Sequence, residues 1–281
     1  MRSFSFEIFP PKRGENLDSV FSCIEDLALC KPDFLSVTFG ASGSKNSTHT
    51  LDIASFIKSL GIRAIVHLPC IHQSKESIRI ILQECERRGL MDILALRGDI
   101  VEKEAKSKDF SYASDLISFI KEQNPSFNTL AACYPEKHQE ALSFAQDLKA
   151  LKIKCDSGAS LLVSQMFFDN EDFFKFMEFC EIAGIKTPVL AGLMPITNAR
   201  VARKISSLCA AKVPQKFARI LSRWEHNPQA LFDAGVAYAI DQIVDLLSHK
   251  GLPENFAGIH IYTMNKSKLG KKIEEAVRIL L

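Results

Sequence analysis

The sequence predicts a single (βα)8 barrel, and three observations lead to this prediction. Strand-like and helix-like segments alternate along all 281 residues. Eight segments have the short apolar or alternating pattern of strands, which is the number that a barrel of parallel strands requires. No linker, internal repeat or low-complexity tract divides the chain. The main alternative is an open doubly wound sheet, in which strands and helices alternate in the same way.

The first expected strand, 3–9, alternates apolar and polar residues and stops at two prolines. Glu7 lies on its less apolar face, near its carboxyl end. In parallel α/β proteins, active sites are built at that end of the strands. The other expected strands are 34–39, 63–69, 92–98, 128–134, 160–167, 188–193 and 258–263.

The expected helices lie between these strands, for example from Leu17 to Cys30 and from Ser74 to Arg88. Ser74 and Asn170 precede acidic residues and are expected to be N-caps. Three glycines stand where helices are expected to end: Gly61, Gly89 and Gly184.

The last part of the chain carries more helical sequence than one crossover needs. We expect extra helices near residues 197–248, one of them around Pro214 to Trp224. A closing amphipathic helix is expected from Ser267 to Leu281. Residues 1–281 are therefore expected to form one domain.

Composition excludes several classes of function. The formal net charge is only +2, without the basic surplus of nucleic-acid binders. No apolar run approaches membrane-spanning length, and the N-terminus lacks a signal-peptide pattern. The eight cysteines are dispersed and include no CxxC pair, as in proteins of a reducing compartment. We therefore expect a cytoplasmic protein without nucleic-acid or membrane partners.

Polar side chains come at the ends of seven expected strands, and in a barrel they would meet at one mouth. One such residue often only begins a solvated loop, but seven that converge indicate an active site. They are Glu7, Ser36 with Thr38, His67, Arg97 with Asp99, Tyr134, Gln165, and Tyr262 with Asn265 and Lys266.

The residue types at this mouth narrow the chemistry. Only one His, one Asp and one Glu lie at strand ends, so a metal site is not expected. No Gly-x-Gly-x-x-Gly or Walker loop follows a strand, which disfavours a Rossmann dinucleotide site. A phosphate-bearing ligand could instead be held by Arg97, His138, Lys154 and backbone amides at helix N-termini.

Seven motifs, in order along the chain, resemble those of the bacterial 5,10-methylenetetrahydrofolate reductases. The resemblance runs from Phe4 to the Tyr262–Asn265 segment, and its specificity lies in the order and spacing of the motifs. They are Ser5-Phe6-Glu7-Ile8-Phe9-Pro10-Pro11, Ser36-Val37-Thr38-Phe39-Gly40-Ala41, His67-Leu68-Pro69-Cys70, Leu94-Ala95-Leu96-Arg97-Gly98-Asp99, Tyr112-Ala113-Ser114-Asp115-Leu116, Tyr134-Pro135-Glu136-Lys137-His138 and Gln165-Met166-Phe167-Phe168-Asp169.

The resemblance implies a (βα)8 TIM barrel with non-covalent FAD at its carboxyl-terminal mouth. NADH or NADPH would reduce the flavin and leave. Methylenetetrahydrofolate would then bind and be reduced to 5-methyltetrahydrofolate, a ping-pong reaction of one-carbon metabolism that supplies methionine synthesis. The resemblance also implies that the chain lacks the regulatory domain of plant and animal members. We separately expect a homo-oligomer.

By resemblance, Glu7 is the general acid that protonates N10 of the folate, which opens the five-membered ring to an iminium that accepts hydride. A free glutamate has a pKa of ~4.3, so this role requires a raised pKa. The simpler interpretation is a solvated carboxylate or an ion pair.

The resemblance also assigns the cofactor residues. Asp99 would lie between flavin and folate as a second catalytic residue, although an Asp after Gly98 is also a common turn residue. Arg97 would bind flavin, or else form a structural salt bridge. The positions that would contact FAD are Thr38, His67, Arg97, Gly98, Asp99, Tyr112, Ala113, Ala132, Tyr134, His138, Asp147 and Lys154.

For the folate, the resemblance assigns Gln165, Phe173 and Lys266. Gln165 offers a donor and an acceptor to a pterin edge. Phe173 could equally be a packing residue. Four positions depart from the best-known bacterial member: Lys266 replaces an arginine, Ile205 an aromatic residue, and Ile153 and Ala150 polar residues.

The sequence is also compatible with two other functions. One is a folate-binding subunit that works only with a partner electron carrier. The other is a metal-dependent barrel hydrolase, which would bind a divalent metal and no flavin.

Overall fold

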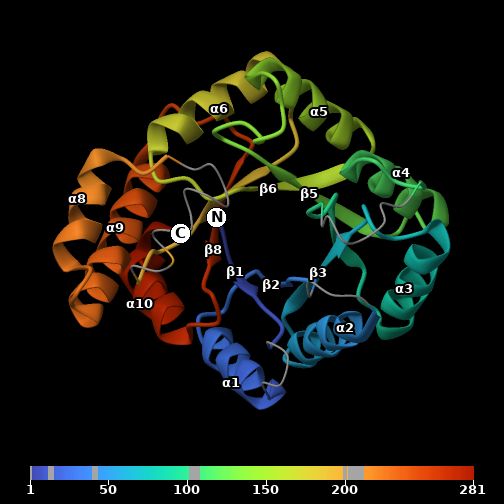
Figure 1. Cartoon of the computed structure of the whole chain (residues 1–281), viewed down its shortest axis with the longest axis horizontal. Helices are drawn as coiled ribbons and strands as arrows, with labels where there is room; N and C mark the ends of the chain where they lie inside the picture. Colours follow the sequence, from blue (N-terminus) through green and yellow to red (C-terminus); the bar gives the residue numbers. More distant parts are fainter. Residues whose placement is uncertain (1, 12–15, 40–43, 101–107, 199–200, 202–211) are drawn as a thin grey trace.

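The computed structural model is a closed barrel of eight parallel strands surrounded by helices (Figure 1). It describes residues 2–11, 16–39, 44–100, 108–198, 201 and 212–281. The strands are β1 (Ser3–Ile8), β2 (Phe34–Val37), β3 (Arg63–Pro69), β4 (Asp92–Leu96), β5 (Asn128–Cys133), β6 (Ala159–Ser164), β7 (Val189–Leu193) and β8 (Phe256–Tyr262).

Each strand pairs with its neighbours in the sequence, and β8 pairs with β1 to close the sheet. The predicted barrel is therefore confirmed, and the open sheet is wrong. Between the strands lie α1 (Leu17–Ala28), α2 (Ser44–Ser59), α3 (Lys75–Arg88), α4 (Ala113–Gln123), α5 (Phe144–Asp156), α6 (Asn170–Ile182), α8 (Gln215–Trp224), α9 (Pro228–Ser248) and α10 (Ser267–Val277), with a short 3-10 turn at Arg278–Leu280.

Most of the expected helix signals hold. Ser74 caps α3, and Gly61, Gly89 and Gly184 take positive φ angles of 77°, 65° and 67°. The extra helix around Pro214 to Trp224 is α8. Asn170 was wrong as an N-cap, because the Asp169 side chain accepts from the Glu171 amide and caps α6.

Asn170 instead begins α6 and faces α9. Its side-chain amide donates to the main-chain oxygen of Gln242 at 3.0 Å and to Asp245 at 2.7 Å. Two adjacent short polar residues can both cap a helix, so the sequence alone does not decide between them.

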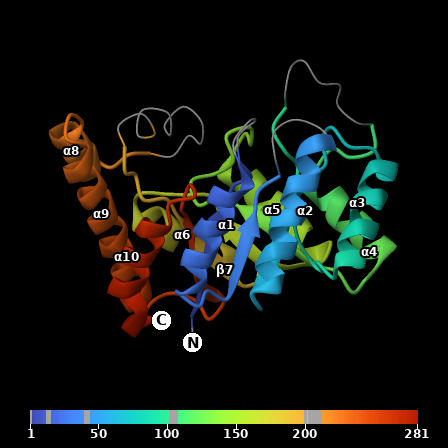
Figure 2. The same cartoon turned by 90° about the horizontal axis from the view of Figure 1, so that it is seen from below.

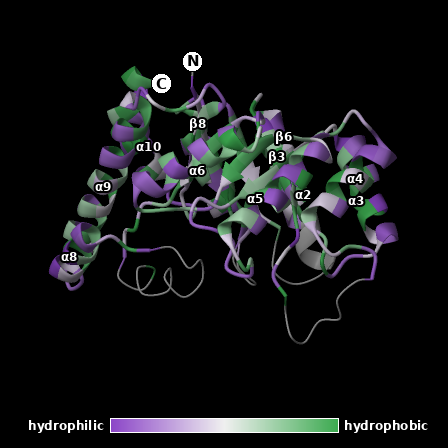
Figure 3. Ribbon diagram, turned by 90° about the horizontal axis from the view of Figure 1, so that it is seen from above, coloured by the Kyte–Doolittle hydropathy of each residue, from purple (hydrophilic) through white to green (hydrophobic). Residues whose placement is uncertain are grey.

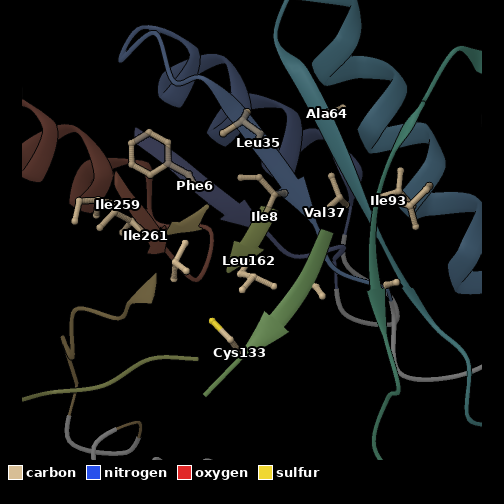
Figure 4. Packing of buried hydrophobic residues seen from close by; sticks show 14 of the residues in the cluster. Phe6, Ile8, Leu35, Val37, Ala64, Ile93, Cys133, Leu162, Ile259 and Ile261 are labelled. Carbon is tan, nitrogen blue, oxygen red and sulfur yellow. The ribbon is translucent and has the colours of Figure 1, made fainter. Parts of the chain in front are cut away.

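The main hydrophobic core lies between the barrel and the helices. It includes Phe6, Ile8, Leu35, Ile93 and Ile261, which point outward from the strands (Figure 4). Apolar residues gather in the central strands, and many of the loops are hydrophilic (Figure 3). Of the helices that the structure describes, none has the length and apolar character needed to cross a membrane.

The interior of the barrel has an apolar and a polar part. The apolar part takes one residue each from β2 to β7: Phe34, Ile65, Leu94, Leu130, Val163 and Leu190. The polar part comes from β8, β1, β2 and β3. We call it the polar sector, and its residues are Ser5, Glu7, Ser36, His67 and His260.

The two ends of the chain meet at the amino-terminal face of the barrel. The Arg2 amide donates to the main-chain oxygen of Leu281 at 3.2 Å. Figure 2 shows the two labelled termini close together on one side of the molecule.

Candidate active site

Glu7 lies at the top of the polar sector with only 7% of its surface exposed. Burial raises its pKa to about 8, so the carboxyl is mostly protonated at neutral pH. His67 Nε2 lies 3.7 Å from Glu7 Oε2, and burial lowers the pKa of His67 to about 3. Burial thus favours the neutral form of each group, and Glu7 is a buried side chain rather than a solvated carboxylate.

The end of β1 is fixed by β8 and the loop after it. Thr263 Oγ1 donates to the main-chain oxygen of Glu7 at 2.9 Å. The side-chain amide of Asn265 both accepts from the Phe9 amide and donates to its carbonyl, each at 2.8 Å. These bonds hold the Glu7 backbone at the mouth independently of its side chain.

Tyr262 crosses the mouth beside Glu7, its partner in the β1–β8 register. Its hydroxyl donates to the main-chain oxygen of Ser164 at 2.5 Å, which ties β8 to β6. The ring passes over Gly192 of β7, where an added Cβ would lie 2.7 Å from the hydroxyl oxygen. The strand-end pattern placed Tyr262 at the mouth without giving it a role.

The end of β4 carries charge. Arg97 forms a two-point ion pair with Glu140, with Nη1–Oε2 at 2.5 Å and Nη2–Oε1 at 2.7 Å. This pairing raises the pKa of Arg97. Asp99 is exposed, and His72 Nε2 lies 3.1 Å from its main-chain oxygen. Gly98 between them has φ of 86°, and an added Cβ would lie 2.9 Å from Pro69 Cβ.

Four predicted cofactor residues form one cluster after β5. Lys154 Nζ donates to the main-chain oxygen of Ala132 at 2.5 Å and lies 5.5 Å from the centre of the Tyr134 ring. Burial lowers the pKa of Lys154. The Tyr134 and His138 rings meet edge to face at 4.7 Å, and the His138 amide donates to Asp147 at 2.9 Å.

The remaining cofactor positions surround the same mouth. The Thr38 amide donates to the Ile8 carbonyl at 2.9 Å, beyond the end of β2. Tyr112 is 65% exposed, and Ala113 begins α4. Gln165, which the resemblance assigns to the folate, follows β6 and folds onto its own chain, where its Oε1 accepts from the Met166 amide at 2.9 Å.

The predicted folate residues differ in their placement. The Lys266 ammonium donates to Thr197 Oγ1 at 2.7 Å, and burial lowers the pKa of Lys266. Phe173 is fully buried in the outer core, where it packs on Phe167 and Phe256 at 5.0 and 5.9 Å. The structure therefore does not bring Phe173 to the mouth.

The four departures from the bacterial pattern also differ in placement. Ile153 is 55% exposed on α5, and Ala150 is exposed on the same helix. Ile205 lies outside the described residues. Within the described ranges, no group of three or more His, Cys, Asp or Glu side chains could hold a metal ion.

Sequence reasoning missed His260, which lies beneath Glu7. Its Nδ1 is 2.8 Å from Ser5 Oγ, and burial lowers its pKa to about 3. The sequence does contain a sign of this placement, because His260 lies on the same face of the last strand as Tyr262, which was expected at the mouth. However, a histidine two residues before a strand end does not by itself indicate a site.

Comparisons with known proteins point to one family. The family model described as methylenetetrahydrofolate reductase matches residues 1–278. The 5,10-methylenetetrahydrofolate reductase of Pectobacterium carotovorum subsp. carotovorum is 35% identical over 270 residues, covering 96% of this chain and 88% of the relative. The Escherichia coli (strain K12) reductase is 34% identical with the same coverage. Methylenetetrahydrofolate reductase (NADH) 1 of Arabidopsis thaliana is 31% identical, over 95% of this chain and 46% of the plant protein.

Solved structures of lower identity share the fold. An uncharacterized Clostridium thermocellum protein that binds two copies of 5-methyl-5,6,7,8-tetrahydrofolic acid matches with a TM-score of 0.68 at 13% identity, covering 100% of this chain and 96% of that one. Dihydropteroate synthase from Thermus thermophilus matches with a TM-score of 0.51 at 12% identity, covering 100% and 94%. At these identities the likeness concerns the barrel alone.

Proposed function

Because the chain belongs to the methylenetetrahydrofolate reductase family and is therefore an oxidoreductase, we propose that it reduces 5,10-methylenetetrahydrofolate to 5-methyltetrahydrofolate. The observation that carries this proposal is the buried Glu7 at the barrel mouth, where burial raises the pKa of its carboxyl. A carboxyl with a pKa of about 8 can donate a proton at neutral pH, whereas an ordinary glutamate is almost fully ionised there.

In this proposal, Glu7 donates its proton to N10 of the bound folate. The bond between N10 and the methylene carbon then breaks, and its electron pair stays on N10. The methylene group remains on N5 as an iminium cation, which accepts a hydride to become the methyl group. Glu7 is left as a carboxylate and must be protonated again before the next turnover. His67 is neutral, so no imidazolium beside Glu7 favours premature loss of the proton.

We further propose FAD as the cofactor, and two observations support it. His67 Nε2 is buried without a hydrogen-bond partner among the described residues, and a ligand could supply one. Arg97, His138 and Lys154 offer positive or donor groups suited to a diphosphate. A bound flavin supplies the hydride. The residues proposed to hold it are Thr38, His67, Arg97, Gly98, Asp99, Tyr112, Ala113, Ala132, Tyr134, His138, Asp147 and Lys154.

NADH or NADPH is the proposed source of the hydride, with the nicotinamide and the folate occupying the mouth in turn. Asp99 and Gln165 are proposed to bind the pterin, and Lys266 the anionic tail of the folate. The described residues place no carboxylate against the Lys266 ammonium, which donates to the Thr197 hydroxyl, so an anionic ligand would supply its countercharge. We propose that residues 1–281 form one catalytic domain, that it forms a homo-oligomer, and that its product feeds methionine synthesis.

Anaerobic stopped-flow spectroscopy of the purified protein tests this function. The expected result is a yellow protein whose flavin absorbance is bleached by NADH or NADPH and restored by methylenetetrahydrofolate, with 5-methyltetrahydrofolate as product. Yellow protein that neither nicotinamide bleaches would instead indicate a partner electron carrier. Colourless protein that retains no added FAD would contradict the proposal.

A further inference from the structure

His260 is a buried imidazole that the proposed chemistry does not use. We propose that His260 is a positioning residue: with Ser5 and Ser36 it forms a closed, uncharged floor beneath Glu7 that excludes water and so keeps the proton on the Glu7 carboxyl. The inference deepens the proposed function and rests on it for its catalytic meaning.

Four side chains contact the His260 ring. Its Nδ1 lies 2.8 Å from Ser5 Oγ, and its Nε2 lies 3.5 Å from Ser36 Oγ. The ring stacks on Phe34 at 5.6 Å and meets Tyr262 edge to face at 5.2 Å. Ser5, Ser36 and His260 are 0%, 2% and 1% exposed. The imidazole is therefore buried and in contact with side chains of β1, β2 and β8.

The register of the barrel places this group directly below and beside Glu7. Ser5 precedes Glu7 by two residues and lies on the same face of β1. Ser36 is the partner of Glu7 on β2, and His260 is the partner of Ser5 on β8. The Nε2 edge of the ring, which faces Ser36, is therefore the edge nearest the level of Glu7.

The barrel does not need polar groups at this depth in order to pack. The opposite interior wall is filled by apolar residues, among them Leu130, Val163 and Leu190. Replacing both members of a buried hydrogen bond by apolar groups of similar shape is often nearly neutral for stability. A histidine between two serines therefore calls for a role other than filling space.

That role follows from the groups that face Glu7. They are Ser36 on β2, His67 on β3 and Tyr262 on β8, with His260 one level below, opposite Ser5. None carries a charge at neutral pH, because burial lowers the pKa of both histidines to about 3. Because no cation among the described residues lies beside Glu7, its protonation state depends on how well water can reach and solvate the charged carboxylate.

Removing the ring would change this solvation. A space left between two serine hydroxyls is polar and can hold a water molecule, whereas an apolar space of the same size stays dry. Water beneath the carboxyl would stabilise the carboxylate and lower the pKa of Glu7. The proton would then leave Glu7 at neutral pH before the folate arrives.

The experiment is a pH titration of Glu7 by infrared difference spectroscopy in purified protein without substrate. The carboxyl band is assigned by its absence in Glu7→Gln. In the unchanged protein, Glu7 should titrate near its pKa of about 8. In His260→Ala the midpoint should fall by about one pH unit or more. His249→Ala is the matched control, because this histidine stacks on Phe174 at 3.9 Å far from Glu7 and should leave the midpoint unchanged.

Two conservative variants keep the proposal testable if His260→Ala does not fold. The amide nitrogen of glutamine reaches the place of Nε2, so His260→Gln should retain the wild-type midpoint. The shorter His260→Asn reaches only the place of Nδ1, leaves space beside Ser36, and should lower the midpoint. The inference would be overturned if the Glu7 midpoint did not shift in His260→Ala and His260→Asn. It would also be overturned if the midpoint shifted equally in His260→Asn and His260→Gln. Because the titration needs no turnover, a failure of the proposed reaction would show separately, as absent folate reduction by the unchanged protein.

Discussion

The two sides of the barrel mouth handle charge in opposite ways. On the side of β8, β1, β2 and β3, the ionisable groups Glu7, His67 and His260 are buried and neutral. On the side of β4 and β5, the cations have carboxylates near them: Arg97 pairs with Glu140, and the buried Lys154 lies near Asp147. One side is suited to storing a proton and the other to holding an anionic ligand. What separates the two sides is therefore countercharge: within the described part of the chain Glu7 has no cation beside it, whereas Arg97 and Lys154 each have a carboxylate nearby.

Replacing the Glu7 carboxyl, which holds the transferable proton, should have the strongest effect on the reaction. Glu7→Gln should slow folate reduction by about 10²–10⁴-fold, the range that general acids contribute. Reduction of the flavin by NADH should stay nearly unchanged, because that step needs no proton from Glu7. Stopped-flow measurement of each half-reaction checks this. An equal loss in both half-reactions would mean that Glu7 is not the acid.

The same substitution should stabilise the protein at alkaline pH. The pKa of Glu7 is about 8 when folded and ~4.3 when unfolded, so the folded chain binds more protons in that window. The ionisation of Glu7 therefore lowers the free energy of unfolding as pH rises from about 4 to 8. Glutamine cannot ionise, so Glu7→Gln should gain roughly 3–5 kcal/mol relative to wild type across this window. Urea unfolding at several pH values measures the gain, and a pH-independent difference would speak against a buried, protonated Glu7.

On the charged side, Lys154→Met should weaken FAD retention by at least about tenfold, because a hydrogen bond to a charged group typically contributes ~1.5–3 kcal/mol. Lys152→Met is the control, since Lys152 lies on the same helix and pairs with Asp156 at the surface. Equilibrium dialysis of FAD measures both variants. Equal retention in the two would remove Lys154 from the cofactor site.

The smallest effect is expected at the folate tail. Lys266→Met should raise the KM for methylenetetrahydrofolate about three- to tenfold with kcat little changed, because a half-buried ion contact contributes on the order of 1 kcal/mol. Lys268→Met changes an exposed lysine two residues away and should leave KM unaltered. A fall in kcat without a change in KM would contradict a role in binding.

Local pattern was sufficient for the fold and for the position of Glu7. Alternation in the first strand and the prolines after it place Glu7 at the mouth, where the structure has it. The sequence also predicts the helix ends correctly where a single glycine or serine is the only good capping residue nearby. The prediction that Asn170 caps α6 was wrong because the adjacent Asp169 is an equally good N-cap residue and caps the helix.

The electrostatics of the site depends on contacts that sequence does not contain. The raised pKa of Glu7 comes from burial, and burial depends on residues of β2, β3 and β8 that are far away in the chain. Phe173 illustrates the same limit, because the helix period does not say whether its face meets the mouth or the outer core. The contact between Tyr262 and Gly192 requires the barrel register, which closes only in three dimensions.

The hydrogen bond between Arg2 and Leu281 has a practical consequence for protein engineering. Because the two ends of the described chain touch on the face opposite the mouth, a short peptide could join them without distorting the barrel (Figure 2). New ends could then be opened in a surface loop, giving a permuted chain with the same circular order of strands. Tethering through the joined end would also leave the mouth turned toward solvent on an electrode or a bead.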